Sequence, residues 1–218
     1  MEVGLIFLAV ILASLIGWML KQSFNTQPWV AEHVDEASYQ APFNAGAKAV
    51  ALAALLAVIT SFFALMVSAY SLRMELGDWV PLTEPQLLWT NTVVLILASI
   101  VFQWTRNAAR NGISQRIKPG LLLTGFLTTA FLVGQYIAWQ QLNASGHYIT
   151  SNPADAFFFL LTGLHALHIL GGMYVWARAT LRVFGGSNDI EESIQLCTVY
   201  WHFLLVVWLV LFGLMLST

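Results

Sequence analysis

Charged residues are scarce in this chain. Of its 218 residues only 9% are Asp, Glu, Lys or Arg, whereas 58% are hydrophobic. A soluble domain carries about 25% charged residues, so the composition excludes a soluble globular protein and indicates an integral membrane protein. The formal net charge of −2 also speaks against a nucleic-acid partner, because nucleic-acid-binding proteins carry a positive excess.

Cysteine and intramembrane acids are scarce too. The single cysteine, Cys197, excludes a disulfide framework and a CxxC metal motif. The long apolar spans contain no Asp or Glu, and a proton pump needs buried acids along its path. The chain by itself is therefore not expected to move protons. A channel or transporter is the last of the alternatives, because no polar path crosses the spans.

Six apolar segments are long enough to cross a membrane as helices. The first follows Glu2 rather than Lys or Arg, and no small-residue cleavage site comes after it, so we expect a retained helix rather than a signal peptide. The six spans cover residues 3–20, 46–72, 86–104, 119–142, 156–177 and 193–216. The predicted fold class is all-α: a polytopic membrane helix bundle with six transmembrane helices.

The basic residues are unevenly distributed between the two sides of these spans. The segment 105–118, expected to be a loop, carries four Lys and Arg residues and no acid. If the spans alternate in direction, eight of the nine basic residues fall on this side and only Arg73 falls on the other. Cytoplasmic segments are enriched in Lys and Arg, so both termini are predicted to lie outside.

Three histidines lie inside the last two spans. His165 and His168 are three residues apart, about 60° around one helix face. His168 lies ten residues before Arg178 and His202 ten residues after Glu192, so both lie about 15 Å from one membrane face. A three-imidazole metal or haem site is conceivable. However, no acid lies at this level to support such ligands, so we expect lipid or interhelical contacts and no metal.

Other polar and small residues of the spans favour helix packing. Gln135 is the only strongly polar residue in the interior of the span 119–142, away from its ends, and is expected to bond between helices. Trp201 and Trp208 lie away from the span ends, so we expect them inside the bundle rather than in an interfacial belt. Three glycines are expected to allow close helix approach: Gly163, Gly171 and Gly172.

Two segments resemble a known family. Residues 156–172 read A-F-F-F-L-L-T-G-L-H-A-L-H-I-L-G-G and residues 200–208 read Y-W-H-F-L-L-V-V-W, as in subunit III of the haem-copper oxidases. The resemblance covers residues 46–216. Residues 1–45 look like an extra N-terminal transmembrane helix and cytoplasmic loop in front of a five-helix domain at 46–218. Shorter matches support the resemblance: Pro81, Pro85, Trp89, Asn91-Thr92, Gly134-Gln135 and Ser151-Asn152-Pro153.

The resemblance implies a non-catalytic subunit of a bacterial terminal oxidase, which oxidises cytochrome c, reduces O₂ to water and pumps protons. No redox centre or catalytic residue is then expected in this chain, and haem and copper belong to the partner subunits. The implied partners are oxidase subunits I and II and phospholipids, in the bacterial inner membrane, where this multi-pass chain stabilises the catalytic subunit. The residues expected to make structural or lipid contacts are His165, His168, Trp201, His202 and Gln135.

Three departures from the family keep alternatives open. Positions at which relatives carry buried acids hold Leu205, Gln195 and Ala57. These residues argue against carrying over the family's support of proton uptake, and they keep open a subunit-III-like accessory protein of a nitric oxide reductase. Subunit III of a quinol oxidase is a further alternative. A distant one is a metal- or haem-binding membrane enzyme centred on the three histidines.

Overall fold

The computed structural model describes residues 47–81, 85–185 and 190–217. Within these ranges the chain forms helices and no strand, which confirms the all-α class. Each helix is long and apolar enough to cross a membrane. The predicted first span, residues 3–20, lies outside the described ranges. The helices are α2 (Ala47–Met74), α3 (Leu87–Arg110), α4 (Ser114–Ala144), α5 (Pro153–Phe184) and α6 (Glu191–Leu216).

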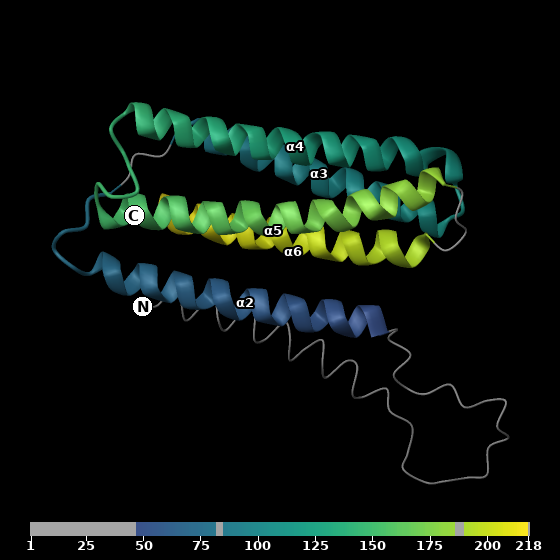
Figure 1. Cartoon of the computed structure of the whole chain (residues 1–218), viewed down its shortest axis with the longest axis horizontal. Helices are drawn as coiled ribbons and strands as arrows, with labels where there is room; N and C mark the ends of the chain where they lie inside the picture. Colours follow the sequence, from purple (N-terminus) through teal and green to yellow (C-terminus); the bar gives the residue numbers. More distant parts are fainter. Residues whose placement is uncertain (1–46, 82–84, 186–189, 218) are drawn as a thin grey trace, which may run out of the picture. The chain divides into compact units, whose positions relative to one another are not determined.

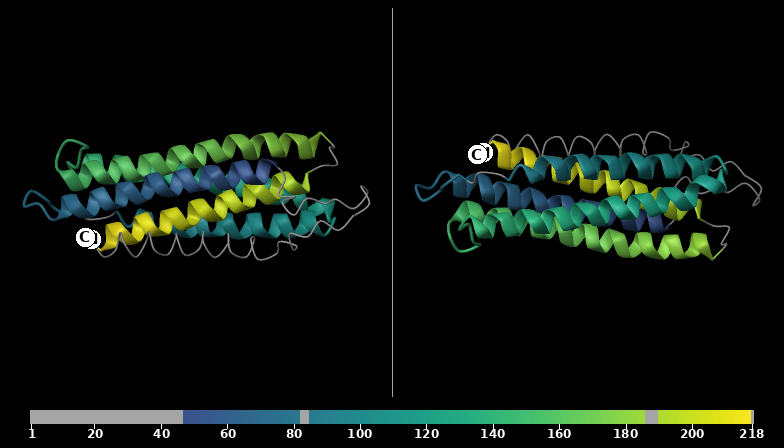
Figure 2. Two further views of the ribbon diagram at one scale, coloured as in Figure 1. Left: turned by 90° about the horizontal axis from the view of Figure 1, so that it is seen from below. Right: turned by 90° about the horizontal axis from the view of Figure 1, so that it is seen from above.

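The chain divides into two compact units, residues 1–68 and 69–218. Of the first unit, the structure describes residues 47–68, all in α2. The second unit contains the last turns of α2 and the helices α3 to α6. These four helices lie side by side and alternate in direction (Figures 1 and 2). In this unit α3 packs against α4 and α6, and α5 also packs against α4 and α6.

Apolar side chains of the second unit point both inward and outward. Phe102, Phe131 and Trp208 are fully buried between the helices, whereas Phe126 and Leu167 are exposed on the surface. In water such a surface would be costly, but the hydrocarbon core of a bilayer solvates it. The four helices thus combine a packed interior with a lipid-compatible exterior.

The basic segment 105–118 is mostly helical, and its prediction as a loop was wrong. Helix α3 continues to Arg110 and α4 begins at Ser114, which leaves residues 111–113 as the turn. Thr105 is fully buried against Gly120, where an added Cβ would lie 2.1 Å from the threonine hydroxyl oxygen. The segment therefore has an inward face that packs like the rest of the helices, and only its outward face is basic.

Two of the three glycines of α5 lie where packing was expected. A Cβ at Gly172 would lie 2.6 Å from the ring of Tyr200 of α6, so only glycine allows this approach. A Cβ at Gly163 would lie 3.5 Å from the ring of Trp139, an ordinary contact distance. The expected close approach is not found at Gly171, because no described residue lies within 4 Å of the position its Cβ would take. Successive residues of a helix differ by about 100° around its axis, so Gly171 points away from α6 while Gly172 faces it.

Helix α5 begins earlier than its apolar run predicted. The uncharged run starts at Ala156, but the helix starts at Pro153 because the side chain of Asn152 caps it. Asp155 therefore lies inside the helix, where it is fully buried. Asp155 lies one residue ahead of the predicted span 156–177, which itself contains no acid.

Candidate functional site

Tryptophan indoles connect the four helices of the second unit. Three indole N–H groups each donate a hydrogen bond to a threonine hydroxyl of a neighbouring helix. These bonds join α3 to α6, α4 to α6 and α4 to α5. The tryptophan–threonine pairs are Trp208–Thr92 at 2.9 Å, Trp201–Thr128 at 3.1 Å and Trp139–Thr162 at 3.0 Å.

Each of these threonines is also bonded to its own helix. The hydroxyls of Thr92, Thr128 and Thr162 donate to the carbonyl four residues earlier, at 2.7–2.9 Å. The oxygen is thereby oriented to accept from the indole, so both polar groups are satisfied without water. Trp201 and Trp208 lie inside the bundle, as expected from their positions away from the span ends.

His202 joins α6 to α3. Its Nε2–H donates to the side-chain carbonyl of Gln103 at 3.0 Å, and its Nδ1 accepts from the hydroxyl of Ser99. The imidazole of His202 is half-buried where α6 meets α3. Both ring nitrogens are occupied by protein groups, which assigns His202 a place in helix packing.

His168 bonds within its own helix. Its Nδ1–H donates to the carbonyl of Leu164 at 2.7 Å. The carbonyl of His168 in turn accepts from the hydroxyl of Tyr200 at 3.0 Å. The contact between α5 and α6 at this level thus uses the backbone of His168 and the side chain of Tyr200.

His165 and Gln135 lie deeper in the interior. His165 is fully buried, with its ring 5.2 Å from that of Trp208 and 6.0 Å from that of Phe131. Neither ring nitrogen has a hydrogen-bond partner among the described residues. The same holds for the amide nitrogen and oxygen of Gln135, which is expected from the sequence to bond between helices.

The three histidines of α5 and α6 do not converge. His202 faces α3, His168 is bonded to its own helix, and His165 lies between Phe131 and Trp208. In the described ranges no group of three or more His, Cys, Asp or Glu side chains could hold a metal ion. A shared depth in the membrane therefore does not place these imidazoles on one ligand set.

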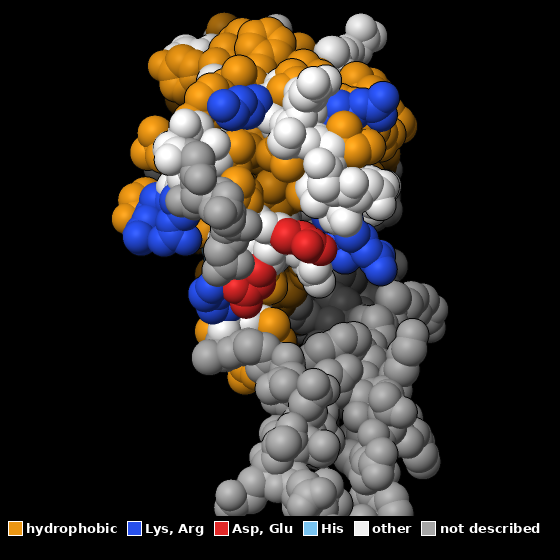
Figure 3. Space-filling model, turned by 90° about the vertical axis from the view of Figure 1, so that its right-hand side faces the viewer, with side chains coloured by type: hydrophobic (Ala, Val, Ile, Leu, Met, Phe, Trp, Pro, Cys, Tyr) orange, Lys and Arg blue, Asp and Glu red, His pale blue; other side chains and the backbone are white. Residues whose placement is uncertain are grey.

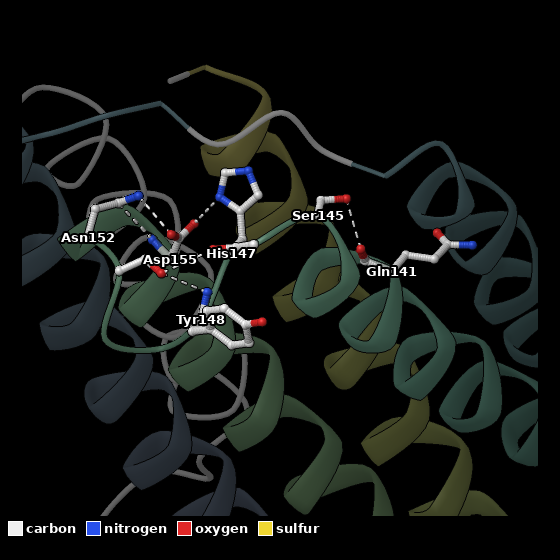
Figure 4. Close-up of polar contacts among 8 residues, drawn as sticks. Gln141, Ser145, His147, Tyr148, Asn152 and Asp155 are labelled. Carbon is white, nitrogen blue, oxygen red and sulfur yellow. Dashed lines mark hydrogen bonds and ion pairs between the residues drawn. The ribbon is translucent and has the colours of Figure 1, made fainter.

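A polar cluster fixes the connection between α4 and α5. The carboxylate of Asp155 accepts from the side-chain amide of Asn152 at 2.7 Å and from Nδ1–H of His147 at 3.1 Å. Asn152 returns a bond, because its side-chain oxygen accepts from the backbone N–H of Asp155 at 3.1 Å. Figure 4 shows the side chains of His147 and Asn152 both directed at Asp155. We call this end of the second unit the capped end.

The cluster at the capped end was missed by the sequence analysis. Ser151-Asn152-Pro153 was quoted only as a family motif, and His147 lies in a segment expected to be a loop. The signal was Asn-Pro-x-Asp ahead of an apolar run, since Asn caps helices and Pro suits the first helical position. An acid in the first turn also interacts favourably with the helix dipole.

The opposite end carries most of the basic side chains, and we call it the basic end. Figure 3 looks onto this side of the molecule and shows Lys and Arg side chains spread around acidic ones. Three of these cations lie over aromatic rings, at 5.1–6.0 Å from the ring centroid. The pairs are Arg116 over Trp104, Lys118 over Phe184 and Arg178 over Tyr174. Such pairs keep charge at the membrane surface while the rings contact lipid.

The capped end has its own exposed ion pair. The guanidinium of Arg73 donates two hydrogen bonds to the carboxylate of Asp78. These hydrogen bonds lower the pKa of Asp78, because they favour its ionised form.

At three positions this chain has an uncharged residue where the family carries an acid. Gln195 is exposed on α6, while Leu205 and Ala57 are half-buried. The one fully buried acid in the described ranges is Asp155, and its carboxylate is bonded to His147 and Asn152. It belongs to the capped end rather than to any of these three positions.

A family model described as cytochrome c oxidase subunit III matches residues 2–217. The match begins at residue 2, so it extends beyond residues 46–216, to which the sequence motifs limited the resemblance. Whether residues 1–45 are an addition to a five-helix form stays a prediction.

Curated relatives carry the same description. A probable cytochrome c oxidase subunit 3 of Mycobacterium leprae is 30% identical over 142 residues, covering 62% of this chain and 69% of that protein. The cytochrome c oxidase subunit 3 of Corynebacterium diphtheriae is 33% identical over 123 residues, covering 56% and 60%. That of Yarrowia lipolytica is 26% identical over 200 residues, covering 84% and 74%.

Proposed function

Because the chain belongs to the cytochrome c oxidase subunit III family, we propose that it is a non-catalytic subunit of a bacterial aerobic terminal oxidase. It stabilises the catalytic subunit and binds phospholipid. The partners are oxidase subunits I and II, which carry the haem and copper. The observation that carries the proposal is the family match over residues 2–217.

The interior of the second unit supports a structural role. Trp201 and His202 of the Y-W-H-F motif are bonded to Thr128, Ser99 and Gln103. Hydrogen bonds between these side chains and neighbouring helices keep the helices in fixed positions, which gives a partner subunit a rigid surface to bind. Haem and copper, held in subunits I and II, supply the electron transfer and the reduction of O₂.

The membrane arrangement is a multi-pass one, and we place it in the bacterial inner membrane. Five helices of the described ranges can span the bilayer, and with residues 3–20 as a sixth, both termini lie outside. The concentration of Lys and Arg at one end of α3, α4 and α5 supports a cytoplasmic location for the basic end.

Phospholipid binding is supported by the surface of the same helices. Exposed apolar side chains along α4 and α5 suit acyl chains, for example Phe126 and Leu167. Cations that lie over aromatic rings at the basic end suit the phosphate groups of the same leaflet. We propose that bound lipid fills the space between this chain and its partners.

The contribution to proton pumping is indirect. Leu205, Gln195 and Ala57 cannot carry protons, and the buried Asp155 is bonded within the capped end. The chain therefore supports proton translocation by keeping the catalytic subunit intact and in its lipid environment.

The test is to purify the tagged chain from its native membrane in mild detergent. Haem and copper are expected in the complex, with oxidation of cytochrome c and consumption of O₂. The chain released from the complex is expected to contain neither haem nor copper, and the remaining oxidase should lose activity faster during turnover. Stoichiometric metal or haem in the isolated chain would overturn the proposal.

The same preparation separates the alternatives. Quinol oxidation without cytochrome c oxidation would assign the chain to a quinol oxidase. Consumption of nitric oxide without consumption of O₂ would assign it to a nitric oxide reductase. The relatives are cytochrome c oxidase subunits, which favours the cytochrome c branch over both.

A further inference from the structure

Several buried side chains of the second unit have polar atoms without a hydrogen-bond partner among the described residues, and three of them lie in the middle of adjacent helices. They are Asn91 of α3, Gln135 of α4 and His165 of α5, with 3%, 2% and 0% of their surface exposed. Among the described residues no hydrogen-bond partner exists for Asn91 Nδ2, for either amide atom of Gln135, or for either ring nitrogen of His165. We call these three residues the polar layer.

The residues of the polar layer lie at one level of the bundle. A Cβ at Gly134 would lie 2.1 Å from Oδ1 of Asn91, so Asn91 contacts α4 next to Gln135. Thr92, beside Asn91, accepts a hydrogen bond from Trp208, and the ring of Trp208 lies 5.2 Å from that of His165.

Phe131 closes the layer on the side of α4. It lies one helical turn before Gln135, and its ring is 6.0 Å from His165 and 5.1 Å from Trp208. The polar layer is thus enclosed by α3, α4, α5 and α6 rather than exposed to lipid.

We propose that the polar layer binds ordered water molecules, which bridge Asn91, Gln135 and His165. Unpaired polar groups are especially costly inside a membrane bundle, and buried waters typically make about three hydrogen bonds to such groups. Bridging water would satisfy these atoms.

The mixture of donors and acceptors selects water over other ligands. Asn91 Nδ2 and Gln135 Nε2 are donors, Gln135 Oε1 is an acceptor, and a neutral imidazole offers one of each. A metal cation would satisfy only the acceptors, an anion only the donors, and an acyl chain neither. Water both donates and accepts, so it matches the whole set.

The experiment is fast X-ray hydroxyl-radical footprinting of the intact oxidase complex in H₂¹⁸O, read by mass spectrometry. Radicals formed from a bound water modify the side chains that touch it. Phe131, beside the polar layer, is compared with Phe102, which is the same residue type and equally buried at 0% exposure. The ring neighbour of Phe102 is Trp201, whose indole is bonded to Thr128. Several-fold more ¹⁸O is expected at Phe131 than at Phe102.

A variant tests whether the ¹⁸O modification of Phe131 depends on the polar layer. Gln135→Leu removes two of the unpaired atoms and should reduce the modification of Phe131 toward the level of Phe102. Thr129→Val is the matched control on the same helix, because the Thr129 hydroxyl donates to the carbonyl of Gly125 in α4 itself. The control should leave the modification of Phe131 unchanged.

Two results would overturn the proposal. Equal modification of Phe131 and Phe102 in the unaltered complex means that no water is bound at the polar layer. An undiminished signal in an assembled Gln135→Leu complex means that any water there is not held by Gln135. If that variant does not assemble, the comparison of the two phenylalanines in the unaltered complex still decides.

Discussion

The two ends of the second unit are stabilised by different means. At the capped end a fully buried carboxylate, Asp155, is bonded to Asn152 and His147. At the basic end, cations such as Lys118 lie over the rings of aromatic residues. The capped end has one acid whose bonds are shielded from solvent, whereas the basic end has many exposed charges whose interactions solvent weakens.

The capped end therefore contributes mainly to the stability of the fold, and the basic end mainly to the orientation of the chain in the membrane. A buried, hydrogen-bonded carboxylate is costly to disturb, because its partners lose their acceptor in a place where water cannot replace it. Exposed cations contribute little each to stability, but together they decide which side of the membrane their end occupies. One end fixes how the helices are joined and the other fixes which way they point.

The largest expected effect is on labelling from the two sides of the membrane. Single cysteines introduced as Ser114→Cys at the basic end and Ser145→Cys at the capped end are both at exposed positions. In intact spheroplasts a membrane-impermeant maleimide should label Ser145→Cys and not Ser114→Cys, since Lys and Arg favour the cytoplasm.

The native thiol does not interfere with this assay, because Cys197 is 4% exposed. Permeabilised cells provide the control, in which both introduced cysteines should react. Labelling of Ser114→Cys alone in intact spheroplasts would reverse the assignment of the two ends.

The next largest effect is expected on stability at the capped end. Asp155→Leu leaves His147 and Asn152 without their acceptor, so the free energy of unfolding should fall by about 1–3 kcal/mol. Denaturant unfolding of the chain in mixed micelles measures the change. Asp155→Asn keeps an acceptor oxygen and should cost less.

The matched control for this variant comes from the basic end. Glu191→Gln removes an exposed acid from the first turn of α6 and should change stability much less. Equal losses for Asp155→Leu and Glu191→Gln would contradict the contrast between the two ends.

The sequence predicts the helices well and their mutual contacts poorly. Apolar length is a property of one segment, so the spans corresponding to α2 to α6 could be predicted. The burial of Trp201 and Trp208 followed from their distance to the span ends. The exact helix starts could not be read from hydropathy, because capping by Asn152 and packing of Thr105 against Gly120 extend helices beyond the apolar run.

In the candidate site, too, the contacts between helices could not be predicted from the sequence. Counting residues gives depth, and it placed His168 and His202 at similar levels. It does not give the rotation of each helix about its axis, which decides that His202 faces Ser99 and Gln103 of α3. The pairing of His147 with Asp155 depends on how the 145–152 connection folds back, which no periodicity encodes.

A smaller effect is expected from a cation at the basic end. Lys118→Met keeps a long apolar side chain but removes the charge over Phe184, which should cost about 0.5–1 kcal/mol. The same unfolding assay measures it, with Lys118→Arg as the control that keeps a cation. A loss as large as that of Asp155→Leu would show that the basic end is not the weaker one.

The smallest effect is expected from the exposed ion pair of the capped end. The hydrogen bonds from Arg73 lower the pKa of Asp78 below its ordinary value of 3.8, so the pair stabilises the folded chain above that pH. The contribution should disappear as the pH falls through the lowered pKa, because the carboxyl group then takes up a proton. Unfolding curves of the unaltered chain and of Arg73→Gln should therefore differ slightly at neutral pH and converge in acid. A difference that grows in acid would contradict the pairing. A carboxyl group whose pKa is lowered by folding contributes less stability as the pH falls.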